Sequence, residues 1–200
     1  QSDSGVVCRS ASGGFPDRRV AVSCGRLHGS ASRVLSYNAP VVSAVGLSNA
    51  ASSGGMSLTV VGRGGLGSSD FSATASVGVS GCAASVWRSD SGLVCRSAGG
   101  MRGGAAVLVS SGVQRGSVSA AVSYDAPSVS SAGVSNVASS GAMSVSVSGR
   151  GMGVGGLSAV GRVGGSACGA SVWRSDSGLV CRVAGGLPGG FGAVVSAGVQ

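Results

Sequence analysis

The sequence predicts an all-β protein built from repeated β-sandwich modules of about 87 residues each. Its strongest sign is the decapeptide WRSDSGLVCR, which occurs at 87–96 and again at 173–182, with a shorter copy, SDSGVVCR, at 2–9. Short stretches that alternate apolar and polar residues lie between clusters of turn residues, as half-buried strands do. The sequence contains no stretch with the periodicity of an amphipathic helix. Many short strands with frequent turns are typical of a β-sandwich.

The repeat divides the chain into three parts. Residues 39–125 form one complete module, residues 1–38 match its second half, and residues 126–200 match it from its start. The third part stops at Gln200, the equivalent of Gln114, before any counterpart of the closing segment RGSVSAAVSY. Self-similarity at a fixed period is the signature of an array of structural units. We therefore expect a half-module, a complete sandwich, and a sandwich that lacks its last strand.

Individual strands and turns can be recognised within each module. The strand-like stretches are SLTV at 57–60, AAVLVSS at 105–111, SVSAAVSY at 117–124 and SVSVS at 144–148. The Gly-rich stretches AGGMRGG at 98–104 and AGGLPGG at 184–190 predict hairpin tips.

A longer pattern resembles a known family. P-x-V-x5-S-N-x2-S-S-G-x-M-S-x2-V-x-G-x-G, followed by a Cys pair around SDSGLVC, is similar to the IPT/TIG domain. That domain is an immunoglobulin-like sandwich of cell-surface receptors, repetitive extracellular proteins and some transcription factors. The pattern covers 39–200, and its second half covers 1–38; Leu47 and Val134 stand where the family usually has Pro. The resemblance implies tandem immunoglobulin-like sandwiches.

The resemblance also implies one disulfide within each module, Cys82–Cys95 and Cys168–Cys181. Each bond would close a short loop and stabilise its module by roughly 3 kcal/mol, which matters for a core that contains few aromatic residues. Paired cysteines indicate an oxidising compartment, so we expect a secreted or cell-surface protein.

Cys8 and Cys24 do not follow this pairing. Cys8 is equivalent to Cys95, but the partner that Cys95 has would precede residue 1, and Cys24 has no counterpart. The two cysteines are equidistant from Pro16 in the turn signal GGFPD, so they could face each other across a two-stranded ribbon. We predict a Cys8–Cys24 disulfide. The alternative is that Cys8 bonds a cysteine upstream and that Cys24 stays free.

The formal net charge of +8 comes from 14 Arg and six Asp residues that are scattered along the chain. Solvated surface charge is the preferred interpretation, and an anionic ligand such as an acidic polysaccharide is the alternative. We expect no nucleic-acid partner, because the Arg residues are dispersed and the cysteines indicate disulfides. The chain contains no apolar stretch of about 18 residues, so we expect no membrane span. The abundant Ser residues suggest O-linked glycans on composition alone.

The sequence offers little for catalysis. GRGGLG at 62–67 matches G-x-G-x-x-G, but the SSDFSATAS that follows has no helical periodicity, so a dinucleotide site is not expected. His28 is the only histidine, and C-x-x-C spacing is absent, which argues against a triad or a zinc site. The Asp residues lack calcium-loop spacing. We therefore expect no enzyme activity, no metal and no cofactor.

Two further features recur in the modules. Trp87 and Trp173 stand beside the Cys pairs, and we expect them to pack in the core against the disulfides rather than to form a platform that stacks on glycans. Arg88 with Asp90 recurs as Arg174 with Asp176. A surface ion pair worth under about 1 kcal/mol is the preferred interpretation, and a repeated contact between modules is the alternative.

These observations favour a structural subunit of an extracellular filament or surface array. A sandwich without its last strand would present an unpaired sheet edge, and HGSASRVLSY at 28–37 matches the missing strand. Donation of that segment to a neighbouring copy would assemble the chain head to tail into a homopolymer. The expected assembly residues are His28, Arg33, Val34, Leu35 and Tyr37. The alternative is a slice of a long tandem-repeat ectodomain that acts as a protein- or glycan-binding adhesion module.

Overall fold

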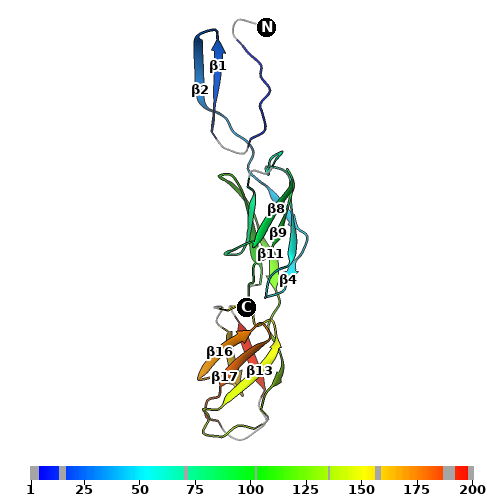
Figure 1. Cartoon of the computed structure of the whole chain (residues 1–200), viewed down its shortest axis with the longest axis vertical. Helices are drawn as coiled ribbons and strands as arrows, with labels where there is room; N and C mark the ends of the chain where they lie inside the picture. Colours follow the sequence, from blue (N-terminus) through cyan, green and yellow to red (C-terminus); the bar gives the residue numbers. More distant parts are fainter. Residues whose placement is uncertain are drawn as a thin grey trace.

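A computed structural model describes residues 5–13, 17–69, 72–101, 103–134, 136–155, 159–186 and 192–197. Over these residues the chain forms strands, turns and bends and contains no helix, so no helix there could cross a membrane. Three units follow one another along the long axis of the molecule (Figure 1). We call residues 5–38 the first unit, residues 39–125 the middle unit and residues 126–197 the last unit.

The middle unit is a sandwich of two sheets. In spatial order, one sheet contains β4 (Asn49–Ala50), β11 (Gln114–Tyr124), β10 (Ala105–Ser111), β6 (Thr74–Val77) and β7 (Ser80–Gly81). The other contains β3 (Val42–Val45), β5 (Ser57–Gly62), β9 (Gly92–Arg96) and β8 (Ala84–Ser89). Alternate side chains of both sheets point inward and form one core that includes Leu58, Val60, Leu93, Val107 and Val109. The all-β, immunoglobulin-like fold class is confirmed.

The last unit has a similar sandwich with fewer strands in its second sheet. Its first sheet contains β12 (Ser128–Ala132), β13 (Ser144–Arg150), β17 (Gly178–Arg182) and β16 (Ala170–Ser175). Its second contains β15 (Ser166–Ala167), β14 (Ala159–Val163) and β18 (Ala193–Ala197). β18 corresponds to β10, but within the described residues no strand pairs with the edge of β18 that β11 occupies on β10. β12 contacts β18 instead.

The first unit contains one hairpin, formed by β1 (Arg18–Cys24) and β2 (Leu27–Leu35). Its pairing repeats that of β10 with β11 at an offset of 87 residues: Val22 faces Gly29 as Val109 faces Gly116. Each hairpin has a register shift after its first pair, at Arg18/Val20 and at Ala105/Val107. The φ angles at this bulge also agree, at 57° for Arg33 and 49° for Ala120. The hairpin of the first unit therefore has the same backbone geometry as β10 and β11, which a second sheet covers.

The predicted Cys8–Cys24 disulfide is wrong, because both cysteines are free and exposed. Cys24 is the last residue of β1 and pairs with Leu27 across the turn at Gly25, not with Cys8. The turn of the hairpin thus lies nine residues beyond the expected centre at Pro16, which itself falls outside the described residues. Gly25 has a φ of 59°, the left-handed conformation that such a tight turn requires.

Candidate assembly surfaces

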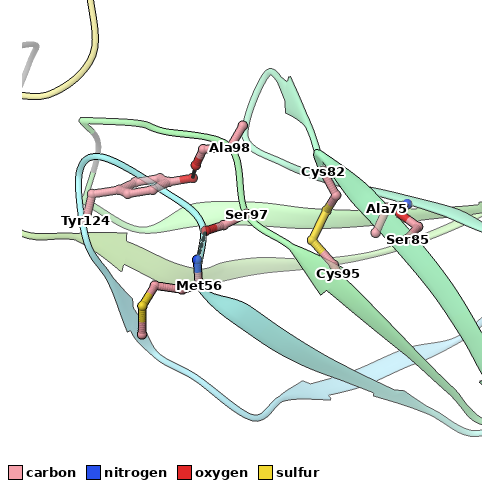
Figure 2. The surroundings of a disulfide bond; sticks show 8 residues. All are labelled: Met56, Ala75, Cys82, Ser85, Cys95, Ser97, Ala98 and Tyr124. Atoms are coloured by element: carbon pink, nitrogen blue, oxygen red, sulfur yellow. Dashed lines mark hydrogen bonds between the residues drawn. A yellow bond between two sulfur atoms is a disulfide. The ribbon is translucent and has the colours of Figure 1, made fainter.

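The two disulfides implied by the family resemblance are present. Cys95 lies on β9 and Cys82 follows β7, so their bond joins the two sheets of the middle unit, with Cα atoms 5.7 Å apart (Figure 2). Cys168 and Cys181 are joined in the last unit with a Cα separation of 5.6 Å. Each bond secures one end of a small, Val-rich sandwich.

A tyrosine secures the end of β11. The Tyr124 hydroxyl donates to the Ala98 carbonyl at 3.1 Å, beside a bond from the Met56 amide to the Ser97 hydroxyl at 3.2 Å (Figure 2). Burial raises the pKa of Tyr124, because the apolar surroundings disfavour the charged phenolate. In the first unit Tyr37 makes the equivalent bond to the Ala11 carbonyl at 2.6 Å. The first unit therefore has the local contacts of a finished module.

The first unit leaves uncovered the face that is core in the middle unit. Leu93 is 0% exposed, whereas its equivalent Val6 is 75% exposed. Val122 on β11 is 1% exposed, whereas its equivalent Leu35 on β2 is 37% exposed. The difference arises because Leu93 and Val122 lie in the core between the two sheets of the middle unit, whereas the described part of the first unit contains a single two-stranded sheet. Val6 and Leu35 therefore expose apolar surface that the equivalent residues of the middle unit bury.

The five expected assembly residues all lie on β2 or just after it, but they do not share one face. Leu35 and Tyr37 match the buried Val122 and Tyr124. Val34 is exposed and matches Ala121, a half-buried residue. His28 and Arg33 match Arg115 and Ala120, which are exposed in the middle unit. Sequence reasoning missed Ala31, which matches the half-buried Val118, because the bulge at Arg33 interrupts the alternation of the strand.

The middle and last units meet through a contact whose Ser52 partner sequence reasoning did not identify. The Ser52 hydroxyl donates to Asp176 Oδ1 at 2.8 Å, and the same oxygen accepts from the Gly153 amide at 2.8 Å. Met101 is buried with Ala159 of the last unit. Gly153 is needed there, because a Cβ at this residue would overlap the Met101 side chain. The sequence signals were the recurrence of Asp90 and Asp176 and the place of Ser52 in the repeated S-S-G.

Asp176 thus corrects the interpretation of the recurring Arg and Asp pairs. Within the described residues its carboxylate bonds to Ser52 and Gly153, so the alternative, a contact between modules, describes it better than an ion pair with Arg174. Asp90, the equivalent residue, accepts from the Gly65 and Gly67 amides at 3.1 and 2.7 Å. Its side chain is exposed, whereas that of Asp176 is half-buried.

Both tryptophans are half-buried and pack against the core clusters that contain the disulfide cysteines. Trp173 Nε1 donates to the Met152 carbonyl at 3.1 Å, and the indole also contacts the cluster formed around Met101. This packing places Trp173 at the joint between the units, where it supports Met101.

An open groove of about 590 Å³ lies beside the Cys82–Cys95 bond. Its lining includes Ser85, Leu108 and Arg115 but no aromatic side chain, and Trp87 is not part of it. Among the described residues, no group of three or more His, Cys, Asp or Glu side chains could hold a metal ion.

A scan against protein-family models finds no match, and no curated protein sequence matches the chain. Solved structures do match. One is the plexin A4 extracellular region, domains 1 to 8, at 15% identity and a TM-score of 0.38, covering 72% of this chain and 15% of that one. Another is SGBP-B from a xyloglucan utilisation locus of Bacteroides uniformis, at 12% identity and 0.35, covering 80% and 46%. A third is the I9-I11 tandem of titin, at 9% identity and 0.30, covering 92% and 70%.

The chain spans only a small part of the plexin chain that it matches. All three TM-scores are below 0.5, so the fold assignment rests on the strand order and register of the chain itself. The resemblance to IPT/TIG domains stays a prediction.

Proposed function

We propose that the protein is a non-catalytic structural subunit of an extracellular filament or surface array, in which β2 of one copy completes the last unit of another. One observation supports this most strongly. β2 already has the register and the bulge that β11 has beside β10, and the corresponding edge of β18 is unpaired within the described residues. The two disulfides support the extracellular location, because such bonds persist in oxidising compartments.

The equivalences set the register of the proposed pairing. β2 would face β18 with Ala31 opposite Ala193, Gly29 opposite Val195, and Leu27 opposite Ala197, as the β11 residues face β10. Leu35 and Tyr37 would then occupy the core positions of Val122 and Tyr124. Two different surfaces meet in this contact, so it extends head to tail. The result is a homopolymer built by strand donation.

The exchange is energetically feasible. Among the described residues β2 pairs only with β1, and an isolated two-stranded hairpin is marginally stable in water. Moving β2 from β1 to β18 replaces one set of backbone hydrogen bonds by an equivalent set. It also removes the Leu35 side chain from water, which stabilises the complex by about 1 kcal/mol for an already half-covered side chain.

Leu35→Asp should abolish assembly. In the free hairpin residue 35 pairs with Arg18 at the water-exposed end, so a carboxylate is tolerated there. In the proposed complex the same carboxylate would enter the core of the last unit, where an unpaired charge is strongly unfavourable. Analytical ultracentrifugation and negative-stain electron microscopy of the oxidised full chain measure the effect.

The matched control is Ser32→Asp, on the same strand. Ser32 is exposed, and so is its equivalent Ser119 in the finished sandwich, so this variant should assemble like the unmodified chain. Equal assembly of both variants would contradict strand donation by β2. A chain that stays monomeric at every concentration would leave the protein- or glycan-binding adhesion module as the better function.

A further inference from the structure

The loop around Ser139, in the last unit, repeats the loop around Ser52. The Gly54 amide donates to the Ala51 carbonyl and the Gly141 amide to the Ala138 carbonyl, each at 2.9 Å. The Gly100 amide donates to the Ser52 carbonyl and the Gly186 amide to the Ser139 carbonyl, again at 2.9 Å. The φ angles of Gly54 and Gly141 are 79° and 74°. The backbone around Ser139 therefore has the same conformation and hydrogen bonds as the backbone around Ser52.

The two serines differ in what covers them. Ser52 is 1% exposed, because its hydroxyl lies against Asp176 of the last unit. Ser139 is exposed, and so are Ser140 and its equivalent Ser53. Ser139 therefore has the backbone conformation of Ser52, but its hydroxyl is exposed. It could donate a hydrogen bond to a carboxylate of another molecule, as the Ser52 hydroxyl donates to Asp176.

The Asp90 turn of the middle unit repeats the Asp176 turn. Both lie in the identical decapeptide WRSDSGLVCR, at 87–96 and 173–182. Asp90 Oδ1 accepts from the Gly67 amide at 2.7 Å, as Asp176 Oδ1 accepts from the Gly153 amide at 2.8 Å. A carboxylate has lone pairs for further donors. Asp90 Oδ1 also accepts from the Gly65 amide at 3.1 Å, whereas Asp176 Oδ1 accepts from the Ser52 hydroxyl as its second donor. Because Asp90 is exposed, a serine of another copy could reach its carboxylate as a further donor.

The proposed strand exchange would bring these two turns together. Tyr124 ends β11 and is followed at once by the connection into the last unit; Tyr37 follows β2 and is followed by the equivalent connection into the middle unit. Suppose that β2 of one copy pairs with β18 of a second copy. The middle unit of the first copy then lies next to the end of the second copy's last unit that is farther from its own middle unit. That end carries Ser139.

We propose that the Ser139 loop is a docking site for the Asp90 carboxylate of a second copy of this chain. The inference rests on the proposed strand exchange and adds a second, polar contact to it. The joint between copies then repeats the joint between the middle and last units within each copy. The array would be a rod with equivalent joints throughout.

Ser139→Glu tests this contact, with Ser140→Glu as the matched control. A carboxylate at residue 139 would face Asp90, whereas residue 140 should stay in solvent, as Ser53 does. We expect Ser139→Glu to raise, by about tenfold, the protein concentration at which half of the chain sediments as assemblies. Ser140→Glu should leave that concentration unchanged. Adding Asp90→Asn to Ser139→Glu removes the repulsion and should restore most of the assembly.

The outcomes separate this inference from the proposed function. A tenfold shift for Ser139→Glu alone, reversed by Asp90→Asn, supports the docking site. Equal assembly of Ser139→Glu and the unmodified chain, while Leu35→Asp still abolishes assembly, overturns the docking site and leaves strand donation intact. A Leu35→Asp variant that assembles normally overturns strand donation itself, and the docking site with it.

Discussion

Replacing Cys82 and Cys95 together by Ala should lower the free energy of unfolding of the middle unit by about 3 kcal/mol. The bond closes a loop with a sequence separation of 13 and joins the end of β7 to β9, so its loss gives the unfolded chain more freedom. Cys95 is also fully buried, and the smaller side chain leaves unfilled volume in the core. The core contains few large side chains that could compensate.

Urea unfolding of the oxidised full chain, followed by Trp fluorescence, measures the change. The matched control replaces Cys8 and Cys24 by Ala, since both thiols are exposed and free. That control should alter the free energy of unfolding by less than about 0.5 kcal/mol. A large loss in the control would show that the first unit contributes to the stability of the sandwich through these residues.

The second large effect is expected from the pair Leu93→Ala and Val6→Ala. The two positions are equivalent in the repeat, but Leu93 lies in the core and Val6 lies in water. Leu93→Ala should cost about 2–5 kcal/mol of unfolding free energy, because it removes buried methyl groups and leaves a cavity. Val6→Ala, studied below the assembly concentration, should change stability by less than about 0.5 kcal/mol.

Thermal unfolding of both variants checks this pair. A cost for Val6→Ala similar to that for Leu93→Ala would mean that the face of the first unit is already covered in the free chain. The assembly proposal, which depends on β2 and not on Val6, would be unaffected.

Much of the fold could be predicted from the repeat. Alternation in SLTV and SVSVS located β5 and β13, and the family resemblance implied both disulfides. The Cys8–Cys24 bond failed because the prediction relied on a strong turn signal at GGFPD. The internal repeat instead indicates a turn at Gly25, because Gly25 is equivalent to Gly112, where β10 turns into β11.

The candidate surfaces were less predictable. The sequence pointed to Leu35 and Tyr37, but it could not separate them from His28 and Arg33, because the bulge in β2 changes which residues share a face. The bond between Ser52 and Asp176 depends on how two units are placed, which no local pattern of either unit encodes. The recurrence of Asp90 and Asp176 was the available sign.

Disulfide trapping between copies tests strand donation most directly. In a chain that carries Cys8→Ser and Cys24→Ser, Leu27→Cys and Ala197→Cys would place two thiols opposite each other only if β2 of one copy lies beside β18 of another. Mild oxidation should then produce a ladder of covalent oligomers on non-reducing gels. Leu27→Cys combined with Val160→Cys, an exposed position on β14, should produce none. The absence of a ladder from the first pair, or equal ladders from both pairs, would contradict assembly by strand donation.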